Sequence, residues 1–140
     1  MSYSIDRLED IFDRTSGHCH ICGGKLAFCN YANFGARGAW EVEHSRPRCE
    51  NGSDRLCNLY PAHISCNRSK QAKSTRAARG QYGRSRAPLS INRRAQAKVD
   101  NALGSGLVGG IIGAAIAGRN GLVVGALIGG KHGYDQNPDY

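Results

Sequence analysis

The sequence of 140 residues lacks any apolar run of the roughly 20 residues that a membrane-spanning helix needs. It also opens with polar and charged residues, without the apolar segment of a secretory signal peptide. These two absences lead us to expect a cytoplasmic protein. In that reducing compartment, the six cysteines favour metal binding over a disulfide framework.

Acidic residues are nearly missing from residues 61–100. This stretch holds ten lysines and arginines but a single acid, Asp100, whereas residues 1–60 hold seven basic and eight acidic residues. A solvated charged helix would alternate the two signs, so this stretch is not typical of one. The surplus of positive charge instead favours a polyanionic partner, either nucleic acid or an anionic membrane surface.

Periodicity and chain breakers predict a small α+β domain followed by a chemically different tail. The predicted elements are a helix, two short strands and a second helix, over residues 4–14, 39–44, 56–60 and 63–78. We divide the chain into a domain, a basic linker, a glycine-rich apolar helical tail and a loose C-terminus, over residues 1–89, 90–102, 103–130 and 131–140.

Two pairs of metal-ligating residues flank the predicted strands, and each pair has two residues between its members. They are Cys19 with Cys22, and His63 with Cys66. This spacing lets both members of a pair reach one tetrahedral ion, so the four side chains predict a structural Zn²⁺ site. Two alternatives stay open. The cysteines could pack as ordinary buried residues, or another cysteine could replace His63 as the fourth ligand, namely Cys29, Cys49 or Cys57.

The interval between the pairs carries a second pattern, in which Glu43-His44 is followed by Asn58 and then by Asn67. Phosphodiester hydrolysis needs an attacking hydroxide and a cation at the phosphate. An imidazole can accept a proton near neutral pH, and a carboxylate with an amide oxygen suits a hard cation such as Mg²⁺ or Mn²⁺. Taken alone, His44 would be an ordinary hydrogen-bonded histidine at a strand end, but the combination favours catalysis.

In order and spacing, these residues resemble the HNH endonuclease family, in its zinc-containing Cys-x-x-Cys branch. The resemblance implies a small ββα-metal (HNH) domain that cleaves DNA. It implies that His44 is the general base, that Glu43 and Asn67 bind the catalytic Mg²⁺ or Mn²⁺, and that Asn58 steadies the loop and orients His44.

This resemblance extends from about Ser4 to Leu89, and the chain departs from the family pattern at two positions. Glu43 stands where Asp is commoner, and His63 stands where the second pair commonly begins with Cys. Neighbouring strand residues point to opposite faces, so Glu43 and His44 cannot both face one phosphate from a regular strand. We therefore expect the strand to end or bend at these residues.

Basic side chains around the motif are candidates to hold a nucleic-acid backbone. Two of them lie beside His44, and the others follow the motif on what we expect to be one helix: Arg46, Arg48, Arg68, Lys70, Lys73 and Arg76. Contacts of this kind bind phosphates without reading the base sequence. The expected partner is therefore DNA.

The tail repeats glycines at four-residue steps, as in Gly121, Gly125 and Gly129. This spacing places small residues on one helix face and permits close helix–helix contact, so we predict a helical hairpin. It loosely resembles the glycine-zipper tails that occur behind some nuclease domains. Membrane association and self-association are the functional expectations, and a soluble hairpin or a poorly ordered appendage is the alternative.

The sequence as a whole predicts a metal-dependent HNH endonuclease. A zinc-knuckle nucleic-acid-binding module without catalysis is one alternative, because it would share the zinc site and the basic residues. A membrane-associated nuclease toxin, in which the tail determines the biology, is the other.

Overall fold

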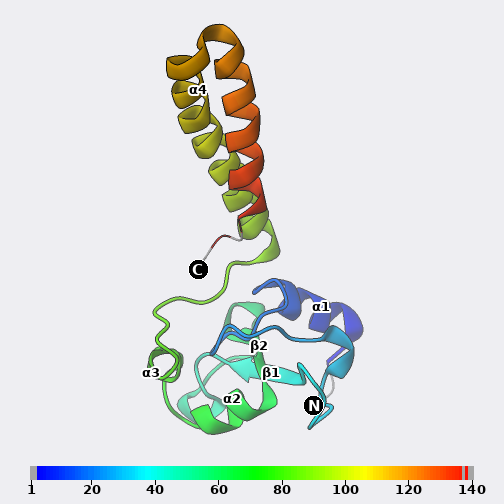
Figure 1. The fold of residues 1–140 in the computed structure, drawn as a ribbon. Helices are drawn as coiled ribbons and strands as arrows, with labels where there is room; N and C mark the ends of the chain where they lie inside the picture. Colours follow the sequence, from blue (N-terminus) through cyan, green and yellow to red (C-terminus); the bar gives the residue numbers. More distant parts are fainter. Residues whose placement is uncertain (1–2, 137, 139–140) are drawn as a thin grey trace. The chain divides into compact units, whose positions relative to one another are not determined.

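The computed structural model describes residues 3–136 and 138, and the chain divides into two units (Figure 1). Unit 1 ends at Ile91 and unit 2 begins at Asn92. Unit 1 combines helices with a two-stranded sheet, which confirms the predicted α+β class. Its helices and strands are α1 (Ile5–Asp13), β1 (Trp40–His44), β2 (Leu59–His63), α2 (Ile64–Lys70) and α3 (Thr75–Gly80).

Helix α1 forms as the sequence predicts. The Ser4 hydroxyl caps it by accepting a hydrogen bond from the Arg7 backbone N–H at 3.3 Å, which satisfies one of the free donors of the first turn. Leu8 and Ile11, one turn apart, are buried. They pack with Trp40 and Leu59 into a core on one side of the sheet.

Strands β1 and β2 pair antiparallel, from Trp40 opposite His63 to His44 opposite Leu59. The second strand begins later than the predicted residue 56, because Leu56–Asn58 forms a 3₁₀ turn. Strand β1 ends at His44, which is one of the two expected outcomes, but it does not bend there, since Glu43 and His44 both stay in the regular ladder. Their side chains therefore leave the strand on opposite faces.

The sheet separates two apolar clusters in unit 1. The larger surrounds Trp40, whose indole ring lies 5.2 Å from the Phe12 ring and 4.9 Å from the Tyr31 ring, measured between centroids. The smaller joins the Cys19 turn to α2 and α3, and contains Ile21, Ala62, Cys66 and Ala78. A domain with clusters this small buries limited apolar surface, so a metal ion would add useful stability.

Helices α2 and α3 replace the single helix predicted over residues 63–78. Helix α2 ends at Lys70, and the next residue, Gln71, has a φ of 50°, which lies in the left-handed region. Helix α3 then restarts after Ser74, whose hydroxyl accepts a hydrogen bond from the Ala77 backbone N–H. Serine is a favoured N-cap, so the restart has a clear local cause.

Unit 2 consists of α4 (Ile91–Asp135), which folds back on itself as a helical hairpin (Figure 1). The backbones of Gly109 and Gly125 are in contact, although a straight helix would separate them by roughly 24 Å. Two segment predictions are wrong here, because residues 91–102 and 131–135 are helical rather than linker and loose end. Within the described residues, no helix has the length and apolarity needed to cross a membrane.

Candidate functional site

The four predicted zinc ligands come together at one end of the sheet. Their ligand atoms, on Cys19, Cys22, His63 and Cys66, all lie within 4.8 Å of one another. In the part of the chain that the structure describes, no other group of three or more His, Cys, Asp or Glu residues is placed to hold a metal ion. Three sulfurs and one imidazole nitrogen match the donor set of a closed, structural Zn²⁺ site.

Local hydrogen bonds build this metal site before any ion is considered. The Cys19–Gly24 turn closes through backbone bonds from Cys19 N–H to Gly24 O and from Gly23 N–H to Cys19 O, each 2.8 Å long. The backbone N–H groups of Gly24 and His63 point at the Cys22 and Cys19 sulfurs, at 3.4 and 3.3 Å. Such N–H···S contacts stabilise thiolates.

The imidazole of His63 is oriented for a role as a ligand. Its Nε2 lies 3.2 Å from the Lys25 carbonyl oxygen, which can only accept a hydrogen bond. The proton is therefore on Nε2, and Nδ1, 3.3 Å from the Cys22 sulfur, keeps a free lone pair for the ion. The three other cysteines are exposed and outside the group, so the structure does not favour any of them as the fourth ligand.

The thiols of this site also favour metal binding electrostatically. Hydrogen bonds from Cys22 and Cys66 lower the pKa of Cys19 to about 3. Hydrogen bonds with Cys19 and Cys22, together with burial, raise the pKa of Cys66. The cluster therefore carries a thiolate at neutral pH, and thiolate is the form that binds zinc.

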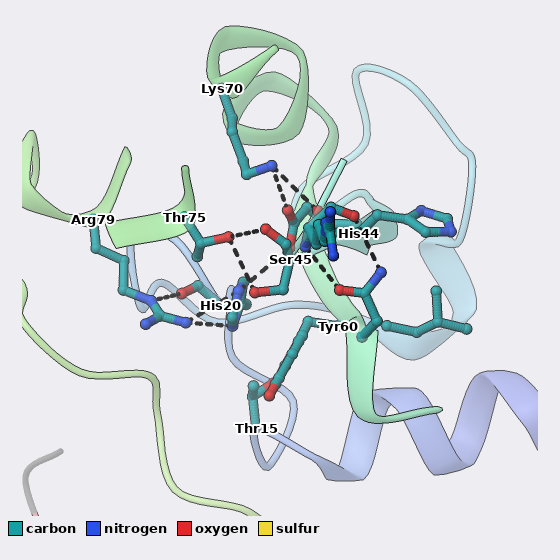
Figure 2. Close-up of polar contacts among 12 residues, drawn as sticks. Thr15, His20, His44, Ser45, Tyr60, Lys70, Thr75 and Arg79 are labelled. Carbon is teal, nitrogen blue, oxygen red and sulfur yellow. Dashed lines mark hydrogen bonds and ion pairs between the residues drawn. The ribbon is translucent and has the colours of Figure 1, made fainter. Parts of the chain in front are cut away.

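Glu43 lies on the face of β1 that α2 covers, and its side chain is fully buried. One carboxylate oxygen lies 2.9 Å from the Lys70 ammonium nitrogen, and the other lies 3.3 Å from Nε2 of His20. Figure 2 shows Lys70 extending from its helix toward the strands. Burial raises the pKa of Glu43, while the hydrogen bond from Lys70 opposes that shift.

His20 connects Glu43 to α3. Burial and the charges of Arg79, Arg14 and Lys70 lower the pKa of His20 to about 2, so its imidazole is neutral. A guanidinium nitrogen of Arg79 lies 2.8 Å from Nδ1 of His20 and 3.0 Å from its Nε2 (Figure 2). Nε2 also faces the Glu43 carboxylate, at 3.3 Å, which can only accept a hydrogen bond.

His44 lies at the other end of the sheet, opposite the metal site along the strand. Its Nε2 lies 2.7 Å from an Asp54 carboxylate oxygen, and Arg48 contacts that same oxygen at 2.7 Å. The same Nε2 lies 3.2 Å from Nε of Arg48, which can only donate a hydrogen bond, so Asp54 and Arg48 together hold the imidazole of His44 in place. Hydrogen bonds from His44 and Arg48 hold the pKa of Asp54 below its ordinary value.

Asn58 closes the loop that joins the two strands. Its side-chain oxygen accepts a hydrogen bond from the Arg46 backbone N–H at 2.7 Å, and its amide nitrogen donates to the Arg46 and Ser53 carbonyls at 3.1 and 2.9 Å. The loop is tight, since a Cβ at Gly52 would collide with the backbone of Arg46 and Pro47. These bonds hold the loop of residues 46–53 to Asn58, and the role of Asn58 in orienting His44 stays a prediction.

The predicted ligand pair for a catalytic Mg²⁺ or Mn²⁺ is not brought together as an open site. The amide nitrogen of Asn67 donates to Glu41 at 2.9 Å, while the Glu43 carboxylate faces Lys70 and His20. A buried carboxylate that already contacts an ammonium does not offer its oxygens to a second cation. Glu43 and Asn67 in this arrangement therefore do not fit a divalent ion.

Five of the six predicted phosphate-binding residues are exposed, and one is not. Lys70 is buried against Glu43, so its assignment to a DNA-binding surface is wrong for this structure. The expected single basic helix is also replaced by α2 and α3. The five exposed residues are therefore divided among the loop after β1, the two helices and the segment between those helices. The exposed five are Arg46, Arg48, Arg68, Lys73 and Arg76.

No protein-family model, curated protein or solved structure that we compared with the chain matches it. The resemblance to HNH endonucleases in the motif therefore stays a prediction.

Sequence reasoning missed the residues that surround the predicted site. Asp54 stands in a segment interpreted only as a loop, and Arg79 was counted only as positive charge. One available signal was the scarcity of acids in the loop that follows His44, because Glu50 and Asp54 are the only acids in residues 45–58. No pattern in the sequence indicated that Lys70 would turn inward toward Glu43.

Proposed function

We propose that this protein is an endonuclease of the HNH type that hydrolyses DNA phosphodiester bonds, with His44 as the general base. The observation that carries the proposal is the Asp54–His44 pair at the end of β1. The side chain of His44 is 13 % exposed and that of Asp54 50 %, so both can be reached by solvent and by a large substrate.

In this proposal, Asp54 and Arg48 fix the orientation of His44. Nδ1 takes a proton from a water molecule as that water attacks phosphorus. The bond from phosphorus to the leaving sugar oxygen breaks, and that oxygen takes a proton from solvent. The positive charge that develops on the imidazole is stabilised by the neighbouring carboxylate. General-base catalysis of this kind contributes typically about 10²–10⁴-fold in rate. Asp54 is a positioning residue, since it acts through His44.

The substrate class follows from the charge around His44. Arg46 and Arg48 are exposed on the loop beside it, and Arg68, Lys73 and Arg76 are exposed on and between the following helices. Guanidinium and ammonium groups bind phosphate oxygens and hold a polyanion without reading its bases. We therefore propose DNA as the substrate.

The proposed role of Zn²⁺ is structural. The metal site joins the Cys19 turn to the end of β2 and the start of α2, so an ion there would hold the strands and α2 in register. Dependence of cleavage on Mg²⁺ or Mn²⁺ remains a prediction from the motif, because Glu43 and Asn67 are engaged elsewhere.

A plasmid-nicking assay with the full chain tests the proposal. We expect His44→Ala to lower the cleavage rate at least about 100-fold while zinc content and DNA retardation stay at wild-type levels. Glu50→Gln is the matched control, because Glu50 is an exposed acid on the same loop and should cut at the wild-type rate. Cleavage by His44→Ala at the wild-type rate would reject His44 as the base.

The same assay separates the two metals. Protein treated with EDTA is assayed after addition of Zn²⁺ alone, Mg²⁺ alone or Mn²⁺ alone, with bound zinc measured in each sample. A requirement for Mg²⁺ or Mn²⁺ in zinc-loaded protein would establish the second ion. Full activity with zinc alone would contradict it.

A zinc-knuckle nucleic-acid-binding module without catalysis is the second candidate function. The observation that favours it is the buried Glu43–Lys70 pair, since a pure binding protein needs no open carboxylate. This candidate predicts DNA binding without cleavage under every metal condition. Retarded but intact plasmid in all lanes would therefore replace the nuclease proposal with the binding module.

A further inference from the structure

Unit 2 carries its small residues where its two arms meet and its large apolar residues on the outside. Backbone contacts join Gly109 to Gly125 and Gly106 to Gly130. The aliphatic side chains point away from these contacts: Leu107 and Ile111 are each 71 % exposed, and Ile116 is 81 % exposed. The described residues of the chain therefore leave this aliphatic surface uncovered.

The exposed aliphatic residues lie on more than one side of the hairpin. On the first arm, Leu107 and Ile111 are four residues apart on one line, and Val108 and Ile112 form a second line about 100° around the helix. On the second arm, the exposed fractions of Leu127 and Ile128 are 69 and 66 %. A helix that is apolar all round belongs inside a protein core or in lipid.

We propose that the α4 hairpin inserts into a lipid membrane that carries anionic headgroups. A second copy of the chain would cover one side of the hairpin, whereas acyl chains cover every side at once. The helical backbone satisfies its own hydrogen bonds, which lipid requires. Contact between the arms through glycines suits lipid as well, because helix association there depends on close backbone packing.

The distribution of charge supports an anionic membrane surface. From Leu103 to Gly130 the only charged residue is Arg119, which the sequence places between the two arms. Five basic residues and a single acid, Asp100, precede the apolar part; the basic residues are Arg84, Arg86, Arg93, Arg94 and Lys98. Basic residues next to an apolar segment are attracted to anionic headgroups at about 1 kcal/mol each.

The length of the arms limits how the hairpin inserts. Leu103 to Ile116 covers 14 residues of α4, or roughly 20 Å at 1.5 Å per residue, whereas the hydrocarbon core of a bilayer is about 30 Å thick. The arms run antiparallel, so both ends of α4 stay on the membrane face from which the hairpin enters.

Flotation of the full chain with vesicles tests this inference independently of nuclease activity. The probes are vesicles of phosphatidylcholine alone and vesicles with 30 % phosphatidylglycerol, each spun through a density gradient. We expect most of the protein to float with the anionic vesicles and less with the neutral ones, and 0.5 M salt to reduce the difference. Protein that stays at the bottom with both vesicles overturns the proposal.

Substitutions locate the inserted surface. Ile111→Glu and Leu127→Glu should each lower the vesicle partition coefficient about tenfold or more, because a carboxylate in the hydrocarbon region is costly. Ile5→Glu is the matched control, since Ile5 is also an exposed isoleucine (68 %) but lies on α1 of unit 1. Equal loss of binding in the control would overturn the assignment to α4.

A fluorescence variant covers the case in which a glutamate unfolds the hairpin. Trp40 is the only tryptophan and is fully buried in unit 1, so its emission should not change with lipid. Ile111→Trp adds an exposed reporter that keeps the surface apolar. Its emission should shift to the blue with anionic vesicles and be quenched by brominated acyl chains. A blue-shifted emission in a lipid-free dimer would instead assign the surface to self-association and overturn the proposal.

Discussion

The two units of this protein use apolar residues in opposite ways. In unit 1 the large apolar side chains lie inside: Ile11, Trp40 and Leu59 have no exposed surface. In unit 2 glycines lie where the two arms meet, and residues such as Leu107 and Ile111 are largely exposed. Unit 1 buries its large apolar side chains, and unit 2 presents its apolar surface outward.

This difference shows that each unit needs a different source of stability. Burial of apolar surface contributes about 25 cal/mol per Å², and unit 1 obtains it from two small clusters, one of which includes Cys19 and Cys66 of the metal site. Unit 2 obtains little of it from its own packing. Its glycines each cost about 1 kcal/mol of helix stability relative to alanine. Four experiments test whether the two units respond separately.

Removal of the metal should have the largest effect, and it should act on unit 1. Zinc binding contributes roughly 10–16 kcal/mol of apparent free energy in small zinc domains, which is enough to decide whether they fold. We expect chelation to abolish the near-ultraviolet circular dichroism of Trp40 while the helical signal of α4 persists. Loss of both signals together would show that the units are one folding unit.

Matched cysteine variants identify the ion's ligands in the same experiment. Cys66→Ser should abolish bound zinc and the cooperative unfolding of unit 1, because Cys66 belongs to the metal site. Cys57→Ser should change neither, because Cys57 is exposed and outside the site. Equal zinc content in both variants would contradict the assignment.

Loss of the buried Lys70 charge should have the next largest effect, again in unit 1. Lys70→Met leaves the Glu43 carboxylate buried and without its cation, and breaking such a pair costs about 3–5 kcal/mol. Denaturant unfolding at pH 7 measures this loss. The double variant Lys70→Met/Glu43→Gln should recover much of it, since no buried charge is left.

The pH dependence of the same variants checks the cause. Burial raises the pKa of Glu43, so folding favours its protonated form. The deficit of Lys70→Met should therefore be full above the folded pKa of Glu43 and shrink as the pH falls through it. The double variant should show no such dependence. A deficit that is constant with pH would assign the effect to packing instead.

The metal site could be predicted from the sequence because its geometry is local. The spacing of two residues within each pair identifies all four ligands from the sequence. Only the approach of the two pairs to each other depends on the fold. The surroundings of His44 could not be predicted in the same way. Asp54 reaches His44 only because the loop of residues 45–58 turns tightly at Gly52, and loop paths are not specified by residue spacing.

Helix boundaries show the same division between local and non-local causes. Ser74 is a readable cap, and attention to it would have divided the predicted helix over residues 63–78. The left-handed conformation of Gln71 is not readable, because glutamine has no preference for it. The inward turn of Lys70 is likewise non-local, since its partner Glu43 lies on another element.

A pair of glycine substitutions should have a smaller effect, and it should act on unit 2. A Cβ at Gly109 would collide with the backbone of Gly125, whereas nothing lies within 4 Å of a Cβ at Gly104. Gly109→Ala should therefore weaken the contact between the arms by about 1–3 kcal/mol. Gly104→Ala should instead stabilise the helix, by about 1 kcal/mol. Thermal loss of the α4 helical signal, followed in zinc-loaded protein, measures both. Equal behaviour of the two variants would contradict the hairpin.

Loss of the α1 cap should have the smallest effect and should again be confined to unit 1. Ser4→Ala removes the hydroxyl that accepts from the Arg7 backbone N–H, at a cost of about 1 kcal/mol. For a domain of this size, that is a fall in the unfolding midpoint of about 4–8 °C. Ser4→Asp keeps an acceptor at the cap and should stay near the wild-type midpoint. Because α1 is fixed in place by Leu8 and Ile11 as well as by its cap, the helix should persist in both variants. A midpoint for Ser4→Ala equal to that of wild type would mean that packing alone determines the stability of α1, and that unit 1 does not depend on the caps typical of helices in water.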